Sequence, residues 1–491
     1  MALVPLLGFA PDVEPTTAGA MLECAGMIPS LRGMKAAASN VATSYPASAE
    51  VVTGAALLQK LDGSVRFFIG GATLLQEGVS GSWSNVSRGG GYAAGDNRWR
   101  FAQFGNDSIA ANKSCKLQRS TGAAFADLTA PKAALCETAA GFVILANCDD
   151  SLGGMGTAFG DQPDRWWCCG INDVATWTPS LAAQCATGRL VDAPGPIRAL
   201  RRLGPNVIAY KDKAIFVGSY VGAQGGVWAW SLIPGDIGCS SQESVVNIGT
   251  AHLFIGETDI YQFDGSRPEP IGAPLRQWFF ARLNRSYQFK IAAMHDRVNG
   301  LVWWFYPSTS SASGALDEAI VYNYRTGRWG FVSRSIELPI ELVQGGITYD
   351  NLGSLFATYD DLPAISYDSP FWVANSPVPA LVGTDHRPYT VGGAPGAWSF
   401  ATHLYGDEQA TTLISRVNAR WLTKPASASL ISRYGMDESA SLASVSPVPM
   451  SAATGRFDFL RSARWHQLAI SGSGDAELVG LDVQIELDGA E

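Results

Sequence analysis

Carboxylates beside predicted turns are the residues of this sequence best suited to acid–base chemistry. A pair of carboxylates can supply the acid and the base of a glycosidase. Each of them lies next to a turn, where a solvated charge is the ordinary explanation, so no catalytic residue is assigned and no enzyme is expected. The five carboxylates are Glu257, Asp259, Asp296, Asp317 and Glu318.

The histidine and cysteine patterns favour neither a metal site nor a cofactor. The five histidines are scattered, without an HxH or HExxH pairing, and the eight cysteines include an adjacent pair, Cys168-Cys169, but no CxxC. The sequence also lacks the GxSxG of hydrolases and the GxxxxGK[ST] of nucleotide-binding loops. We therefore expect reduced, mostly buried thiols, no metal and no cofactor.

Two further groups have both a functional and a structural reading. Asp173 and Trp177, in NDVATW, resemble the Asp-box turn of sialidases, which is a structural turn there too. Arg198, Arg201 and Arg202 form a local basic cluster that suits a phosphate contact, although a solvated edge or an intersubunit salt bridge is the favoured explanation.

The elements that would position these residues are short strands closed by tight turns. His252 to Ile255 and Leu301 to Tyr306 are rich in aromatic and branched residues, and Asp264-Gly265 and Asn299-Gly300 are turn signals. The chain of 491 residues is 47% hydrophobic and only 16% charged, which favours an all-β protein over a helical one. Groups of three or four strands recur about every 40 to 50 residues, the spacing of β-propeller blades.

The expected organisation has three parts. Residues 1–45, interrupted by prolines, predict an extended N-terminal docking arm; residues 46–365 predict propeller blades, including one over Leu342 to Asp361 with a turn at Asp350-Asn351. A Pro-rich connector over Ser366 to Gly383 opens residues 366–491, where longer alternating strands predict a β-sandwich-like domain packed on or closing the propeller. Tryptophans should fill the spaces between blades: Trp83, Trp177, Trp228, Trp303, Trp304 and Trp329.

Apolar residues of the arm are the candidates for an assembly interface. Leu6, Phe9, Met27 and Ile28 have little local structure to bury them, so we expect them to dock on a neighbouring subunit or, equally, on the body of the same chain.

The net charge of −9 offers no basic field for gripping nucleic acid. No basic region precedes the apolar N-terminus, and no run of 18 apolar residues suits a membrane span. The sequence therefore predicts synthesis in a cytoplasm and no membrane partner.

Four stretches together resemble the head-to-tail nozzle proteins of short-tailed bacteriophages, also called tail tubular protein B or phage stabilisation proteins. They begin at Leu7 (LGFAPDVEP), Arg165 (RWWCCGINDVATWTPS), Ser244 (SVVNIGTAHLFIGETDIYQFDG) and Ser462 (SARWHQLAISGSGDAELVGLDVQIELDGA), and their order and spacing match the family over most of the chain. The chain lacks room for the large inserted domains of the bigger members.

The resemblance implies a structural virion protein located in the tail and assembled in the host bacterial cytoplasm. It implies a hexameric ring of propeller protomers below the portal and the adaptor ring, which continues the DNA exit channel, retains packaged DNA and mounts tail fibres or spikes. Genomic DNA would pass through the lumen without specific binding. The alternative from another class is a propeller hydrolase or lyase acting on host-surface polysaccharide, and a monomeric propeller lectin is a third reading.

Overall fold

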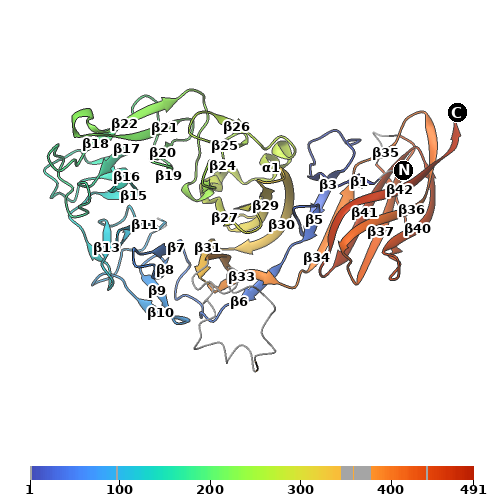
Figure 1. The fold of residues 1–491 in the computed structure, drawn as a ribbon, viewed down its shortest axis with the longest axis horizontal. Coiled ribbons are helices and arrows are strands. Elements are labelled where there is room, and N and C mark those ends of the chain that lie inside the picture. Colours follow the sequence, from blue (N-terminus) through green and yellow to red (C-terminus); the bar gives the residue numbers. More distant parts are fainter. Residues whose placement is uncertain (1–2, 96–97, 344–357, 359–376, 438–440, 491) are drawn as a thin grey trace.

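The computed structural model describes residues 3–95, 98–343, 358, 377–437 and 441–490. Strands make up 53% of the chain and helices 4%, which confirms the all-β prediction. A ring of blades lies beside a smaller β domain, and both chain ends lie in that smaller domain (Figure 1).

The ring is a β-propeller built from units of four strands. Six blades are separate four-stranded sheets, and a seventh, β27 to β30, is the first part of a ten-stranded sheet. From the innermost to the outermost strand, the blades are: β7 (Gly54–Gln59), β8 (Val65–Gly70), β9 (Leu75–Val79) and β10 (Ser82–Asn85); β11 (Arg100–Phe104), β12 (Asp107–Ala111), β13 (Gln118–Ser120) and β14 (Ala126–Asp127); β15 (Lys132–Ala139), β16 (Phe142–Asp149), β17 (Asp161–Cys168) and β18 (Thr187–Arg189); β19 (Ala199–Leu203), β20 (Asn206–Tyr210), β21 (Ile215–Gly222) and β22 (Val227–Ile233); β23 (Val246–Asn247), β24 (His252–Ile255), β25 (Ile260–Phe263) and β26 (Pro268–Pro270); β27 (Ala292–Asp296), β28 (Leu301–Tyr306), β29 (Leu316–Asn323) and β30 (Arg328–Ile336); β31 (Leu338–Val343), β32 (Pro377–Val382), β33 (Pro388–Gly393) and β6 (Ser39–Ala42).

The innermost strands close the ring around one axis. They contact one another in chain order from β7 through β11, β15, β19, β23 and β27 to β31, and β31 contacts β7. The last blade takes its outermost strand from the N-terminal segment, because β6 pairs antiparallel with β33 and places Ala42 opposite Tyr389. Backbone hydrogen bonds therefore tie the beginning of the propeller to its end.

The predicted strands and turns are present. His252–Ile255 and Leu301–Tyr306 form β24 and β28 with the expected ends. Gly265 and Gly300 adopt φ of 102° and 68°, a backbone region that glycine accepts readily and other residues resist. The Asp350-Asn351 turn lies outside the described residues.

Helical segments are few and short in the described part of the chain. One, η1 (Ala223–Gly225), lies between β21 and β22 of the fourth blade. The others connect the fourth blade to the fifth, η2 (Gln242–Ser244), and the fifth to the sixth, α1 (Arg276–Arg282) and η3 (Arg285–Lys290). Phe279 of α1 is buried and meets Tyr306 of β28 edge-on with ring centres 4.9 Å apart, so α1 packs against the sixth blade.

Tryptophans fill the interior as predicted. Trp177, Trp304 and Trp329 are fully buried, Trp228 and Trp303 are buried, and Trp83 is half-buried against Tyr45. The indole N–H of Trp177 donates to the carbonyl of Val174 at 2.7 Å, and that of Trp304 donates to the carbonyl of Ser244 at 2.8 Å. Each of these two rings therefore packs in the interior with its indole N–H hydrogen-bonded.

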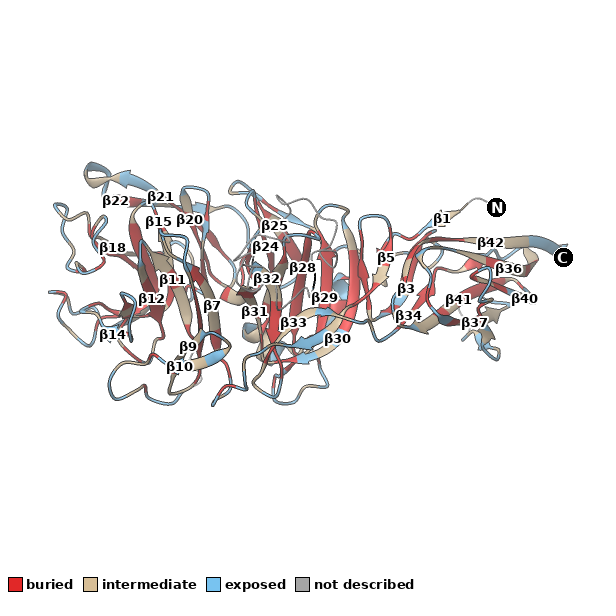
Figure 2. Cartoon of the chain, turned by 60° about the horizontal axis from the view of Figure 1, so that its bottom comes forward, coloured by how far each residue is buried: buried red, intermediate tan, exposed pale blue. Residues whose placement is uncertain are grey.

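The smaller domain is a β-sandwich, which agrees with the predicted fold class. One sheet continues the ten-stranded sheet from β30 through β4, β5, β42 and β36 to β40, and the other runs from β2 through β3, β34, β41 and β37 to β38. Ile414 and Phe457 of the first sheet and Phe400 and Leu468 of the second share one core, visible as buried strand faces in Figure 2. Its strands are β1 (Val4–Pro5), β2 (Gly8–Phe9), β3 (Ala20–Ala25), β4 (Met27–Pro29), β5 (Met34–Ala36), β34 (Ala397–Thr402), β35 (Tyr405–Gly406), β36 (Ala410–Thr423), β37 (Ser427–Gly435), β38 (Ala443–Ser444), β39 (Val448–Pro449), β40 (Arg456–Ala463), β41 (Trp465–Ser473) and β42 (Glu477–Ala490).

The predicted division into three parts needs correction. The described part of the predicted arm, residues 3–45, contributes strands to both lobes rather than forming a docked arm, because β3 pairs with β34 while β4 pairs with β30. The propeller extends past residue 365, since β32 and β33 belong to its last blade.

The predicted connector is the source of the boundary error. Pro377 and Pro379 suggested an irregular segment, but they pair only with β31, and the ladder between β32 and β33 begins at Ala380. Prolines are tolerated where no ladder hydrogen bond is needed from their nitrogen.

Candidate functional site

The four residues expected at an assembly interface are buried inside the chain. Leu6, Phe9, Met27 and Ile28 have exposed fractions of 2%, 2%, 0% and 4%. The ring of Phe9 meets that of Trp278 edge-on, with centres 4.8 Å apart. These buried side chains therefore offer no surface to a neighbouring subunit. Of the two expected arrangements, the structure shows the one in which they pack on the body of the same chain.

The five candidate carboxylates are held by local partners. Asp296 accepts from the backbone N–H of Asn299 at 3.1 Å, and Glu318 accepts from the hydroxyl of Tyr306 at 2.7 Å. None of the five shares a hydrogen-bond partner with another among the interactions of the described residues. Other contacts include Glu257 with Lys213 at 3.3 Å, Asp259 with Arg276 at 3.3 Å, Asp317 with the backbone N–H of Ser308 at 2.7 Å, and Glu318 with Arg282.

Asp173 and Trp177 form a structural turn, as their pattern suggested. The carboxylate of Asp173 accepts from the backbone N–H of Ala175 at 2.9 Å and from the hydroxyl of Thr176 at 2.7 Å. Trp177 is 1% exposed and accepts from the indole of Trp167 through its carbonyl at 3.0 Å. The turn anchors a buried tryptophan.

Histidines and cysteines have structural surroundings. Burial lowers the pKa of His252, His295 and His403 to about 4, so these imidazoles are neutral near pH 7. All eight cysteines are buried free thiols, and burial raises the pKa of Cys136 to about 12. No cluster of three or more potential metal ligands occurs among the described residues, and none of the described helices is long and apolar enough to cross a membrane.

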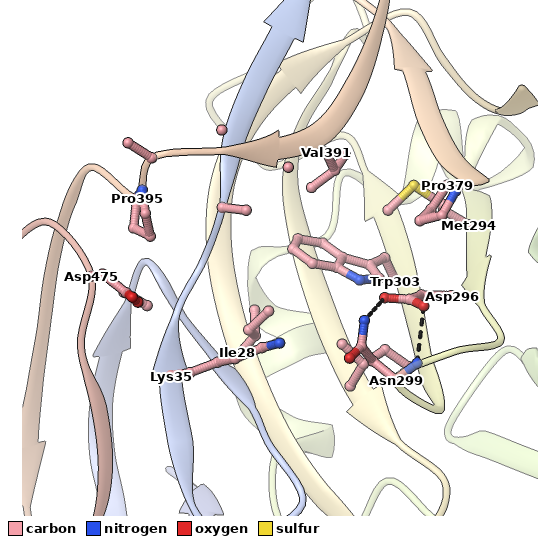
Figure 3. A pocket seen from close by; sticks show the side chains of 16 residues that line it. Ile28, Lys35, Met294, Asp296, Asn299, Trp303, Pro379, Val391, Pro395 and Asp475 are labelled. Atoms are coloured by element: carbon pink, nitrogen blue, oxygen red, sulfur yellow. Dashed lines mark hydrogen bonds between the residues drawn. The ribbon is translucent and has the colours of Figure 1, made fainter. Parts of the chain in front are cut away.

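A cleft of about 510 Å³ lies where the last two blades meet the sandwich (Figure 3). Lys35 enters it from β5 and Asp475 from the turn before β42. Trp303 lines one wall but is only 2% exposed, and the carboxylate of Asp296 is engaged by Asn299 through the backbone and the side chain, at 3.1 and 2.6 Å. The cleft therefore offers no open stacking face at Trp303, and the carboxylate of Asp296 is already hydrogen-bonded.

A second, smaller cavity of about 160 Å³ lies on the propeller axis. Its apolar wall comes from innermost strands, with Ala55 of β7, Cys136 of β15 and Ala292 of β27 among the lining residues. Its polar groups are Arg100 of β11, Arg201 of β19 and Gln242 and Glu243 of η2. Strands far apart in sequence thus bring two guanidinium groups and one carboxylate together.

Glu243 is the centre of this charged group. Its carboxylate accepts from Nε of Arg100 at 2.8 Å and from Nη2 at 3.3 Å, and Nη1 of Arg98 lies 3.4 Å away. Burial alone would raise the pKa of Glu243, but Arg100 and Arg98 outweigh burial and lower it to about 2. The carboxylate is therefore ionised at neutral pH and ties the start of β11 to η2.

The three arginines that are clustered in the sequence, Arg198, Arg201 and Arg202, lie in different surroundings. Arg198 pairs with Asp212 at the surface, 3.1 Å apart, and Arg202 is exposed and donates to the carbonyl of Gly204 at 2.8 Å. Arg201 alone lines the axial cavity. Sequence reasoning missed Arg98, Arg100 and Glu243, and no local signal marks them, because only ring closure brings them to Arg201.

No protein-family model matches the chain, and no curated protein matches its sequence. Among solved structures, it is similar to YCF48 bound to a D1 peptide, with a TM-score of 0.37, 13% identity, and coverage of 64% of this chain and 92% of that one. Virginiamycin B lyase from Staphylococcus aureus has a TM-score of 0.37 and 10% identity, with coverage of 63% of this chain and 93% of that one. YCF48 from Cyanidioschyzon merolae has a TM-score of 0.34 and 12% identity, with coverage of 63% and 93% in the same order. These similarities are too distant to assign a function, and the propeller is established by its strand pairing.

Proposed function

We propose that this chain is a structural virion protein, the protomer of a tail nozzle that assembles as a hexameric ring. In this role the ring lies below the portal and adaptor, continues the DNA exit channel, retains packaged DNA and mounts tail fibres or spikes. The proposal starts from the resemblance of four stretches to nozzle proteins, and it includes no catalytic step.

The observation that carries the proposal is the continuous sheet between the two lobes. Hydrogen-bonded pairs run without a break from β27 of the propeller to β40 of the sandwich. The same apolar cluster contains Leu253 and Trp304 of the propeller and Leu430 and Val483 of the sandwich. Domains joined only by a linker move relative to each other by default. A backbone ladder with a shared core supports a stiff protomer, which suits a load-bearing ring.

The placement of charge supports a conduit between protomers rather than through one. The axial cavity of about 160 Å³ is crossed by the pair of Arg100 and Glu243, so it offers no path for a duplex about 20 Å wide. Six copies with a net charge of −9 each would total about −54. A ring with that total charge would repel phosphates overall, so DNA would slide without adhering.

The test is the mass of the purified protein in solution by light scattering, alone and with its adaptor ring, followed by negative-stain imaging. Rings of about six copies, or monomers that assemble only on the adaptor, are the expected result. A protein that stays monomeric with the adaptor present and cleaves host-surface glycan would refute the proposal.

A further inference from the structure

The last strand of the sandwich, β42, is covered completely along one edge and only at its start along the other. On one side β36 pairs with it over its whole length. On the other side β5 pairs with Glu477 and Leu478, and β1 pairs with Gly480 and Leu481. Beyond these pairs, residues 482–490 have no strand partner on this side among the strands that the structure describes. They form an open edge at the rim of the sandwich, where the end of β42 is exposed (Figure 2).

The backbone groups of every second residue point out of the open edge. The carbonyl of Val479 accepts from the backbone N–H of Leu6 at 2.9 Å, on the side that β1 covers. The N–H and C=O groups of a strand face alternate neighbours from one residue to the next, so those of Val483, Ile485 and Leu487 face this same side. Without a neighbouring strand, such groups are a template for pairing with another chain.

The inner side chains of the open edge are apolar. Val483 is 2% exposed, and Ile485 packs against the shared core of the sandwich. Leu487 follows at the same spacing of two residues, but it is 79% exposed. The described strands therefore leave an apolar side chain uncovered near the end of the edge, and an added strand would bury it.

The outer side chains of the open edge are acidic or polar. Asp482, Gln484 and Glu486 alternate with the inner residues, so they lie on the opposite face of the sheet. Oδ1 of Asp482 is buried without a hydrogen-bond partner among the described residues, and Oδ2 lies 3.5 Å from the side-chain nitrogen of Asn418. Glu486 is exposed. This face therefore presents carboxylate acceptors to donors on a neighbouring strand.

Charge decides which strand fits the open edge. Two copies of β42 that paired edge to edge would bring the carboxylates of both onto one face, and like charges opposite each other destabilise a sheet. Residues 482–490, DVQIELDGA, contain no Lys or Arg that would offset this repulsion. A strand with Lys or Arg at its outer positions and apolar residues at its inner positions would instead pair with Asp482 and Glu486 and cover Leu487.

We propose that the open edge of β42 binds an extended segment of another protein, in which basic and apolar residues alternate. The segment adds as a strand in the antiparallel direction that β1 already takes on this edge. This binding surface does not depend on the proposed role in a tail.

The test uses the full chain and a labelled peptide of sequence GRVRVRVG, followed by fluorescence anisotropy at physiological ionic strength. We expect saturable binding of one peptide per chain. In an antiparallel pair with inner residues facing inner residues, the N–H groups of the valines face β42 and those of the arginines face solvent. Methylation of the valine nitrogens should therefore abolish binding, whereas methylation of the arginine nitrogens should retain it.

Two pairs of variants locate the site on β42. Leu487→Pro removes one outward N–H and should weaken binding by about tenfold, whereas Leu487→Ala keeps that N–H and should weaken it by about threefold or less. Glu486→Gln should weaken binding by about threefold. Glu269→Gln makes the same change of charge on β26, the outermost strand of the fifth blade, and should leave binding unchanged. Circular dichroism establishes that each variant is folded.

Amide hydrogen exchange of the wild-type chain gives a readout that needs no variant. The bound peptide should slow exchange within residues 482–490. Absence of saturable binding, equal losses in Leu487→Pro and Leu487→Ala, or protection confined to the propeller would overturn the proposal. Self-association of the chain that Leu487→Pro abolishes would also overturn it, because the occupant of the edge would then be a second copy.

Discussion

Replacing Glu243 by Gln tests the electrostatics of the propeller axis most directly. The side chains of Glu243, Arg98 and Arg100 are only 17%, 16% and 18% exposed, so solvent screens them weakly. A pKa lowered from 4.5 to about 2 corresponds to about 3 kcal/mol of folding free energy from the ionised carboxylate. Removing one partner of a buried ion pair costs about 3 to 5 kcal/mol in other proteins. Both routes predict that Glu243→Gln lowers the free energy of unfolding by about 3 kcal/mol at pH 7.

The same pKa fixes how this difference depends on pH. Because the folded-state pKa lies below the unfolded value, the stabilisation is complete above about pH 4.5 and is lost as the pH falls towards 2. Wild type and Glu243→Gln should therefore differ most at neutral pH and converge near pH 2. The groups facing this carboxylate are Arg98, Arg100, Arg201 and the hydroxyl of Ser241.

The assay is urea denaturation followed by tryptophan fluorescence, since the chain has 15 tryptophans. Glu257→Gln is the matched control, because its ion pair with Lys213 has exposed fractions of 50% and 65% and should contribute little. A difference below about 1 kcal/mol at pH 7, or one that stays constant from pH 7 to pH 3, would refute the role given to Glu243.

Four other predictions follow from burial and strand pairing. Phe9→Ala should lower the free energy of unfolding by about 3 to 5 kcal/mol, whereas Leu7→Ala, at a side chain that is 50% exposed, should change it by less than about 0.5 kcal/mol; equal effects in denaturation curves would contradict the packing of the N-terminal strands. Deleting residues 1–43 removes β6 and opens the last blade, so the truncated chain should lose cooperative thermal unfolding, and a sharp transition like that of the full chain would be evidence against closure by β6. Burial lowers the pKa of His252 to about 4, so its contribution to stability is complete above about pH 6.5 and is lost as the pH falls to 4; His252→Gln should flatten stability curves over that range, and an unchanged slope would contradict it. Cys24, whose pKa burial raises to about 12, should resist a thiol reagent until the protein unfolds, and rapid labelling of the native chain would show that the site opens.

Local sequence predicted much of the propeller. The ends of β24 and β28 were predictable because aromatic and branched residues alternate with turn signals over a few positions. The recurrence of such groups predicted blades, and the tryptophans within them predicted the interior. These properties depend on neighbours along the chain, so the sequence contains them directly.

The fate of residues 1–45 could not be predicted in the same way. Their prolines exclude a long helix, but they do not say which distant strand a short extended segment will join. Pairing of β4 with β30, β5 with β42 and β6 with β33 depends on edges that exist only after the ring and the sandwich have formed.

The sequence by itself determined an all-β chain with repeated units of three or four strands and a low-charge, aromatic interior. Tertiary structure decided which charged residues meet. Arg100, Arg201 and Glu243 lie on three separate elements, and their meeting on the axis follows from closure of the ring rather than from their spacing. Hydrophobic alternation specifies which face of a strand is buried, whereas the partners of a charge inside a ring depend on the distances between blades, which no local pattern encodes.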